Sequence, residues 1–310
     1  MLDELEAQRP QLLRHCYRML GSFADAEDLV EETLMKARAS SRARLPLLRI
    51  ATNGCLDFLK KHHHLHLPQR ESEPAAIVDA YGTLEETHWL TPAPDAKLFT
   101  SQAEAAGKRE SVALAFIALL QHLPPKPRAV LLLRDIAGWP AAEVAQSLAL
   151  SVPAVNSALH RARRSLKGAD ETAAKDQEPD PELLRAYVRS WEEHDVQGLV
   201  ALLRKEVVFA MPPHALWFRV ARTVARFVQT GRFEPWSSGL RVRLTRANGC
   251  PALAFYLRSD RTYKLHSLQL VRFSRGQVAE AVTFIGAHYL RGFQLPRTIS
   301  KGAAQKLQRR

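Results

Sequence analysis

The chain has 310 residues, of which 46% are hydrophobic and 25% are charged. This length predicts about two domains with room for a small third one, and this composition excludes a chain disordered throughout. Lys and Arg (44) exceed Asp and Glu (32), and the net charge of +12 indicates a polyanionic partner, most often nucleic acid. The longest apolar run, Val112 to Leu120, is too short to cross a bilayer, and the acidic N-terminus is unlike a secretory signal. We therefore expect a cytoplasmic protein with no membrane contact.

The cysteine and histidine patterns predict no disulfide, no metal site and no cofactor. Cys16, Cys55 and Cys250 lie far apart, form no Cys-x-x-Cys pair, and are expected to be buried thiols. Four histidines follow two lysines at a predicted helix end: His62, His63, His64 and His66. Neighbouring histidines there do not converge on one ion, so we expect them to extend a basic surface.

The first helical block carries an acidic helix and a basic one. Five acids fall within eight residues of its second predicted helix: Asp25, Glu27, Asp28, Glu31 and Glu32. Acidic side chains near a helix N-terminus interact favourably with the helix dipole. These five acids form either a solvated face or a docking face for a basic partner. A third helix is expected over about Leu45 to Lys61. Its polar side carries Arg49, Asn53, Asp57 and Lys60, and this side could address a nucleic-acid backbone.

The second helical block predicts a helix-turn-helix. A short helix over Ala141 to Leu148 is followed by a tight connection, a plausible N-cap at Ser151, and a long helix over Val152 to Lys167. Apolar residues recur along one side of the long helix, and its other side is polar and basic, with no acid. The polar side offers groups for base edges near its start and arginines for phosphates further on.

These two blocks resemble the extracytoplasmic-function sigma factors of the sigma-70 class. Three stretches carry the likeness in the first block: residues 14–22 (RHCYRMLGS), 25–33 (DAEDLVEET) and 49–53 (RIATN). Four carry it in the second: residues 123–125 (LPP), 128–131 (RAVL), 138–139 (GW) and 154–163 (AVNSALHRAR). The resemblance implies that the first block is region 2, which binds core RNA polymerase and the −10 promoter element. The second block is then region 4, which reads the −35 element.

The resemblance also assigns candidate binding residues. The acids Asp25, Glu27, Asp28, Glu31 and Glu32 would meet core polymerase. Arg49, Asn53, Lys60 and Lys61 would meet −10 DNA. The −35 element would be met by Ser151, Asn156, Ser157, His160, Arg161, Arg163 and Arg164. One departure is that the segment from Arg38 to Leu48 is short and has no aromatic residue, whereas the family usually has Trp and Phe there to help hold an unstacked base.

The third segment predicts an α+β domain. Helices are expected around Leu183 to Trp191, from Val196 onward and over Leu216 to Gln229, with a short strand at Val207 to Met211. Further strands are expected around Leu240 to Leu244, at Ala252 to Leu257, at Tyr263 to Phe273 and at Gln277 to Ile285. The turns lie at Asn248-Gly249, Ser259-Asp260 and Arg275-Gly276. Helices followed by an antiparallel meander indicate this class.

From about Asp180 to Pro296 this segment resembles the SnoaL-like cone that a subset of these sigma factors carries. Tyr187, Trp191, the run from Met211 to Pro213, Trp217 to Arg219, and Phe293 to Pro296 carry the likeness by their order. The resemblance implies an apolar pocket that could hold a small-molecule ligand. Candidate acid or base groups are His194, Asp195, His214, His266 and Glu280, but no pair has diagnostic spacing, so we expect no catalytic residues.

The expected organisation has two all-α sigma domains and a C-terminal α+β cone. Its parts are region 2 (1–66), a linker (67–107), region 4 (108–168), a linker (169–180), the SnoaL-like domain (181–296) and a disordered basic tail (297–310). We predict an RNA polymerase sigma factor, not an enzyme, whose C-terminal domain modulates activity. Two alternatives remain open. One is a DNA-binding regulator that docks on polymerase without melting promoters, and the other is a SnoaL-type enzyme fused to DNA-binding domains.

Overall fold

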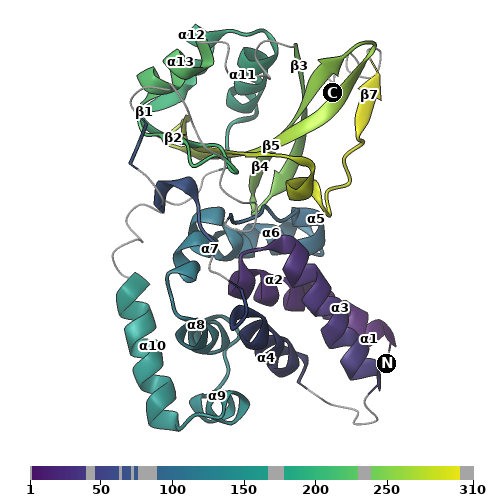
Figure 1. Ribbon diagram of the computed structural model, residues 1–310, viewed down its shortest axis with the longest axis vertical. Coiled ribbons are helices and arrows are strands. Elements are labelled where there is room, and N and C mark those ends of the chain that lie inside the picture. The colour runs from purple at the N-terminus through teal and green to yellow at the C-terminus, as the bar shows by residue number, and fades with distance from the viewer. Residues whose placement is uncertain are drawn as a thin grey trace. The chain divides into compact units, whose positions relative to one another are not determined.

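The chain folds into two compact units, shown in the computed structural model of Figure 1. The structure describes residues 2–39, 46–62, 65–70, 73–75, 89–166, 178–229 and 239–300. The first unit comprises Met1–His66 and Asp95–Ala174, and the second comprises Leu67–Pro94 and Lys175–Arg310. Part of the stretch between the two helical blocks therefore belongs to the C-terminal unit.

The regular elements of the first unit are all helices in the part that the structure describes. Its α-helices are α1 (Leu2–Ala7), α2 (Arg9–Leu20), α3 (Phe23–Ala39), α4 (Leu47–Leu59), α5 (Asp95–Leu98), α6 (Gln102–Lys108), α7 (Leu114–Gln121), α8 (Pro125–Leu131), α9 (Ala141–Leu148) and α10 (Val152–Leu166). A 3-10 turn, η3 (Arg109–Val112), precedes α7, and a π turn, η4 (Leu132–Ile136), follows α8. Helices α2, α3 and α4 pack on one another, and left-handed Gly21 ends α2 by donating its amide to the Tyr17 carbonyl at 2.8 Å.

A buried histidine joins α2 to α4. His15 is 4% exposed, and its Nε2 lies 2.8 Å from the Thr52 hydroxyl, which in turn donates to the Leu48 carbonyl. Burial, helped by the nearby Arg18 charge, lowers the pKa of His15 to about 3. The imidazole is therefore neutral in the folded chain at neutral pH.

The pH dependence of unfolding should report this histidine. The pKa of His15 is lower in the folded chain than in the unfolded chain. Its contribution to the free energy of unfolding is therefore complete above about pH 6.5 and is lost as the pH falls towards 3. Each pH unit in that window costs about 1.4 kcal/mol. We expect the wild-type chain to lose about 2 kcal/mol more than His15→Gln between about pH 7 and pH 5, as measured by urea unfolding. If the free energy of unfolding depends on pH equally in the two proteins, the buried neutral state of His15 is contradicted.

The second unit is an α+β domain built on one seven-stranded sheet. Its helices are α11 (Pro181–Glu192), α12 (Val196–Leu202) and α13 (Ala221–Gln229), with 3-10 turns η1 (Pro68–Arg70) and η5 (Ala287–Leu290). Its strands are β1 (Leu203–Ala210), β2 (Trp217–Phe218), β3 (Leu240–Ala247), β4 (Cys250–Ser259), β5 (Thr262–Ser274), β6 (Gln277–Ile285) and β7 (Thr298–Ser300). The sheet order is β2-β1-β6-β5-β4-β3, with β7 paired to β5. Only the β1–β6 pairing is parallel among the described strands.

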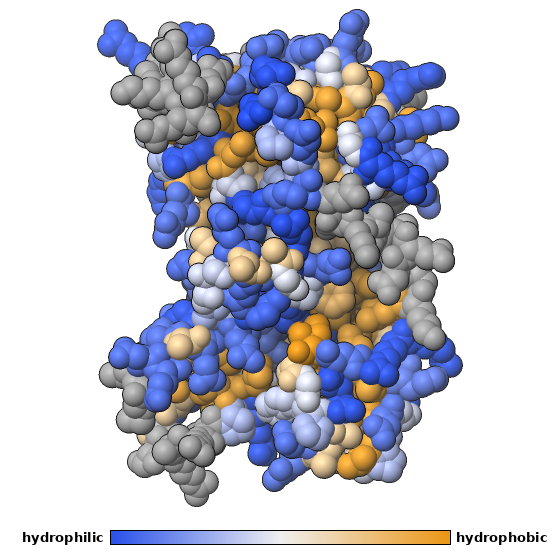
Figure 2. Space-filling model, turned by 180° about the vertical axis from the view of Figure 1, so that it is seen from behind, coloured by the Kyte–Doolittle hydropathy of each residue, from blue (hydrophilic) through white to orange (hydrophobic). Residues whose placement is uncertain are grey.

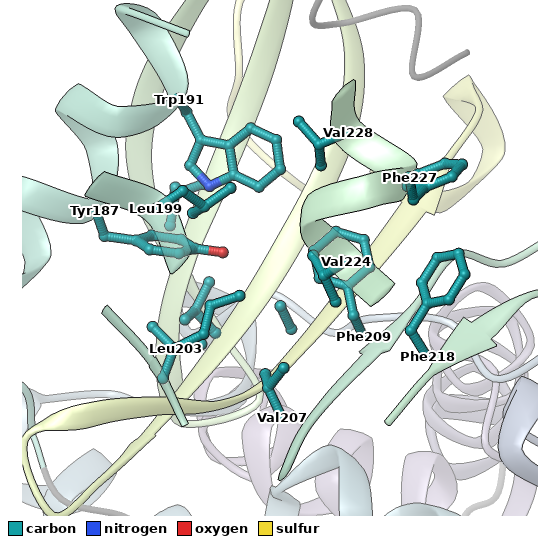
Figure 3. Close-up of a cluster of buried hydrophobic side chains, with 14 of the residues drawn as sticks. Tyr187, Trp191, Leu199, Leu203, Val207, Phe209, Phe218, Val224, Phe227 and Val228 are labelled. Carbon is teal, nitrogen blue, oxygen red and sulfur yellow. The ribbon is translucent and has the colours of Figure 1, made fainter. Parts of the chain in front are cut away.

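Three helices cover one face of this sheet and bury an aromatic core (Figure 3). Tyr187 and Trp191 of α11 meet edge to face, with ring centroids 6.1 Å apart, and Trp191 also packs 5.3 Å from Phe255 of β4. Phe227 of α13 lies 5.0 Å from Phe218 of β2. The Tyr187 hydroxyl donates to Gln269, whose amide donates to Thr283, so this core also holds a satisfied chain of hydrogen bonds.

Three details of the sequence expectation are wrong. The helix expected over Leu216 to Gln229 is shorter, because Trp217–Phe218 form strand β2 against β1 and α13 starts only at Ala221. The tail expected to be disordered begins with strand β7, since β5 offers it a free partner edge; residues 301–310 lie outside the described part. Cys250 is half-buried, whereas Cys16 and Cys55 are fully buried.

Neither a membrane span nor a metal cluster occurs in the described part of the chain. His62 stacks on Phe58, with ring centroids 3.9 Å apart, and His63 and His64 lie outside the described residues. Hydrophilic side chains cover most of the face seen in Figure 2, with smaller hydrophobic areas between them.

Candidate nucleic-acid and polymerase interfaces

Helices α9 and α10 form the expected helix-turn-helix. Ala149 adopts a left-handed conformation (φ 51°) that ends α9, and the Leu150 amide donates to the Ala145 carbonyl at 2.9 Å. The Ser151 hydroxyl then accepts from the Ala154 amide at 3.3 Å, so Ser151 caps α10 as the sequence predicts. Helix α10 packs against both α8 and α9.

The two sides of α10 differ in burial as its sequence pattern indicates. Val155, Ala158, Leu159 and Ala162 are buried, while Leu166 is half-buried. All seven candidate −35 residues are exposed: Ser151, Asn156, Ser157, His160, Arg161, Arg163 and Arg164. Their DNA contacts remain predictions, but their side chains are accessible.

The arginines of α10 have different surroundings. Arg163 binds Asp135 through two nitrogens, at 2.9 Å and 2.6 Å, and this ion pair raises the pKa of Arg163. Arg161 donates to the Ser157 hydroxyl at 2.8 Å. Arg164 forms no ion pair with any described residue, so its guanidinium is not held by a carboxylate of the described chain.

The candidate −10 residues lie along the exposed side of α4 and just beyond it. Arg49 and Asn53 are exposed on successive turns, and Lys60 and Lys61 follow the helix end. Asp57 lies on the same side, where Lys60 pairs with it at 2.7 Å and lowers the pKa of its carboxyl. This pairing offsets the acid within an otherwise cationic face.

The acidic side of α3 is partly occupied by ion pairs within the unit. Glu31 pairs with Arg9 at 2.6 Å, Glu32 with Lys36 at 2.6 Å, and Glu27 lies 3.8 Å from Lys97. Asp25 and Glu27 are half-buried, and Asp28, Glu31 and Glu32 are exposed.

Sequence reasoning missed one residue of this face. Met35 is 65% exposed, the most exposed of the large hydrophobic residues in the described chain. It lies one turn beyond Glu31 and Glu32, so the acidic face also carries an apolar side chain. Exposed methionine is a common anchor in protein interfaces, and its exposure on an otherwise apolar-inward helix is the signal that only the structure provides.

Buried arginines join the two helical blocks within the first unit. Arg128 of α8 is fully buried and donates to the carbonyls of Met19, Gln121 and Leu123 and to the Gln121 side chain. Arg18 of α2 donates to the Ser111 carbonyl at 2.7 Å. Burial lowers the pKa of both arginines to about 10, so both remain charged at neutral pH. The two predicted DNA-binding blocks are therefore packed directly on each other.

The candidate acid–base groups of the cone are engaged elsewhere or dispersed. Asp195 caps α12 by accepting from the Gly198 amide at 2.8 Å, and Glu280 pairs with Arg272 on the sheet face opposite the aromatic core. His266 contacts the Ser267 hydroxyl at 3.1 Å, and burial lowers the pKa of His214. His194 lies at the end of α11 with a positive φ of 59°.

The C-terminal unit holds part of the stretch between the helical blocks. The side-chain oxygen of Asn248 accepts a hydrogen bond from the backbone amide of Ala93 at 2.9 Å. The backbone amide of Asn248 donates to the Ala93 carbonyl at 3.0 Å. Pro94 forms a β-bridge with Ala247, and the Ala75 amide donates to the Trp217 carbonyl at 2.9 Å. This stretch is anchored at two separate places on the sheet domain.

Comparisons with known proteins match both helical blocks and the whole chain. Residues 5–64 match the family described as Sigma-70 region 2, and residues 113–166 match Sigma-70, region 4. The ECF RNA polymerase sigma factor SigG of Mycobacterium tuberculosis is 38% identical, over 95% of this chain and 83% of its own length. This chain belongs to the ECF sigma factors. It is also 28% identical to SigJ of the same organism, over 67% of this chain and 64% of SigJ.

The crystal structure of M. tuberculosis SigJ shares the fold of this ECF sigma factor. The TM-score is 0.63 at 23% sequence identity, covering 96% of this chain and 100% of SigJ. The expected sigma regions and the C-terminal α+β cone are thereby confirmed. The individual polymerase and DNA contacts, the linker boundaries and the small-molecule ligand of the cone stay predictions.

Proposed function

We propose that this ECF sigma factor docks on core RNA polymerase through α3, contacts the −10 element through α4, and reads the −35 element through α10. The observation that carries this is the exposed polar side of α10, which offers Asn156, Arg161 and Arg164 from a helix whose other side is buried. The chain would act in the cytoplasm and have no chemistry of its own. Support for the latter is that Asp195 and Glu280 are committed to a helix cap and an ion pair.

Promoter binding would require the two sigma blocks to separate. The −10 and −35 elements are named by their positions relative to the transcription start, so they lie about 25 base pairs apart. This separation is about 85 Å along a duplex. Helix α2 and helix α8 are joined by the Arg128–Met19 contact, which is a direct hydrogen bond. The arrangement held by this contact would therefore be a closed state, which binding of polymerase and promoter would open.

Met35 should contribute to polymerase binding through apolar contact. We expect Met35→Glu to weaken binding of the chain to core polymerase at least about tenfold, since a buried interface anchor would be replaced by a charge. Lys36→Glu, at the exposed neighbouring position, is the matched control and should change affinity much less. Fluorescence titration of labelled chain with core polymerase measures both. Equal effects of the two variants would show that charge alone matters.

The C-terminal domain would modulate activity by holding the stretch that connects the sigma blocks. Asn248 has a left-handed backbone (φ 54°), so Asn248→Gly keeps the turn while removing the side-chain acceptor for the Ala93 amide. We expect the Ala93 amide to exchange with solvent at least about tenfold faster in this variant, and run-off transcription to change in yield.

Asp260→Gly is the matched control, because Asp260 occupies another left-handed hairpin turn (φ 52°). It should alter neither the exchange of the Ala93 amide nor transcription. Faster exchange with unchanged transcription would contradict modulation through this stretch while leaving the sigma activity intact.

A regulator that docks without melting is the alternative, motivated by the short segment after Arg38. A promoter template with a pre-opened −10 region distinguishes the two. A sigma factor competent for melting should support transcription from both the closed and the pre-opened template. Transcription from the pre-opened template alone would favour the alternative.

A further inference from the structure

The sheet domain carries a cationic stretch that the sigma regions do not explain. Residues 239–279 contain eight Lys or Arg and a single acid, Asp260. Two of these arginines have carboxylate partners: Arg246 pairs with Glu178 at 2.5 Å, and Arg272 with Glu280 at 3.2 Å. The remaining cations are concentrated on β3, β4 and β5.

Strand register places three of these arginines on one face. Arg241 of edge strand β3 pairs with Tyr256 of β4, and Arg258 of β4 pairs with Tyr263 of β5. Arg243 follows Arg241 at an interval of two, so it points to the same side. The opposite side carries Leu240, Val242, Phe255 and Leu257, which belong to or pack on the aromatic core. The arginines therefore lie on the face that the three helices do not cover.

The three guanidinium groups are not held by carboxylates of the described chain; Glu192, at this edge, accepts from the backbone amide of Val242 at 2.9 Å. Arg241 lies over the ring of Tyr263, 5.4 Å from its centroid. Arg258 is exposed, and Arg241 and Arg243 are half-buried. None of the three forms an ion pair with a residue in the described part of the chain. Tyr256 lies opposite Arg241 in the strand register and is fully buried, so it is not part of this exposed surface.

Three guanidinium groups that form no ion pair with a described residue fit a polyanionic partner. Charges on an edge strand can also serve to prevent strand pairing, but Arg258 lies on an interior strand where that purpose does not apply. Arginines on two neighbouring strands can reach successive phosphates, and a guanidinium group can give a phosphate two parallel hydrogen bonds. We call Arg241, Arg243 and Arg258 the arginine face.

We propose that the arginine face binds the phosphate backbone of duplex DNA, so that the C-terminal domain makes a DNA contact of its own. The inference rests on the proposed DNA binding by α4 and α10, because these would keep duplex at high local concentration around the tethered domain. Phosphate contacts carry no sequence information, so this face would add affinity without changing which promoter is chosen. It would also make binding more sensitive to salt.

The test measures binding of the full chain to a labelled 60-base-pair duplex, by fluorescence anisotropy across a salt series of about 50 to 200 mM. Arg241→Gln, Arg243→Gln and Arg258→Gln are combined in one variant. The matched control combines Arg219→Gln, Arg222→Gln and Arg226→Gln, three exposed arginines at and near α13. Both variants remove three positive charges, so they differ only in where the charge is lost.

We expect the arginine-face variant to bind at least about tenfold more weakly, with the slope of log K against log salt reduced by about 2 to 3. The control should keep the wild-type slope. Equal losses in both variants, or no loss in the arginine-face variant, would overturn the inference while leaving sigma activity standing. Wild-type chain that fails to bind duplex at the lowest salt would overturn it as well. The arginine-face variant could instead bind duplex DNA as tightly as the wild type but bind single-stranded RNA more weakly. That result would show that the partner is RNA and would also overturn the inference.

Discussion

Arg128→Ala should destabilise the chain by about 3 kcal/mol or more, measured as the free energy of unfolding in urea. Arg128 is fully buried, and its removal would leave the Met19 and Leu123 carbonyls and the Gln121 side chain short of a donor. A buried acceptor without a partner retains its desolvation cost, and this variant creates more than one. The variant would weaken the packing of α8 against α2, because Arg128 of α8 donates to the carbonyl of Met19 in α2.

Two further variants separate this effect from charge and from volume. Lys126→Ala removes an exposed cation from the same helix and should leave the free energy of unfolding nearly unchanged. Arg128→Met retains much of the side-chain volume but none of the donors, so it should be nearly as destabilised as Arg128→Ala. A stable Arg128→Met variant would mean that packing, and not hydrogen bonding, holds the two blocks together.

Replacing Arg161 and Arg164 together by Ala should weaken holoenzyme binding to a promoter duplex by about tenfold to a hundredfold. Both side chains are exposed on α10, and each is expected to contact one phosphate. Loss of two phosphate contacts should reduce the salt slope by about 2. Holoenzyme titrated against labelled duplex at several salt concentrations gives both quantities. An unchanged slope would show that these arginines do not touch phosphate.

Arg163 provides the internal comparison for that experiment. Its two bonds to Asp135 compete with any phosphate, so Arg163→Ala should weaken binding less than loss of Arg164. Asp135→Asn would release Arg163 and should strengthen binding. If Asp135→Asn instead weakens binding, the ion pair acts by positioning α10, and Arg163 is not a reserve phosphate contact.

The helical blocks could be predicted closely from the sequence because their signals are local. Helix α10 shows this: Ser151 caps it, Val155 and Leu159 mark its inward side, and the candidate DNA residues are exposed as expected. In contrast, Leu216 to Gln229 reads as one helix, yet Trp217 pairs with Ala210 of β1. Tertiary pairing overrides local periodicity at such a short segment.

Long-range contacts lay beyond sequence reasoning. The hydrogen bonds from Arg128 to Met19 and from Asn248 to Ala93 join residues 109 and 155 positions apart. No local pattern distinguishes a fully buried arginine at position 128 from an exposed one. Met35 was missed for the same reason, since a methionine on a helix is ordinarily read as core. The arginine face likewise depends on strand register, which brings Arg241 and Arg258 to one side of the sheet.

The most direct measurement is run-off transcription with the purified chain, core RNA polymerase and a closed duplex from upstream of the chain's own gene. We expect a discrete start site that requires the chain and is lost when Arg161 and Arg164 are replaced. Absence of a transcript from this fragment and from a promoter library, with binding to core polymerase intact, would contradict it. That result would mean that the chain docks on polymerase without opening DNA.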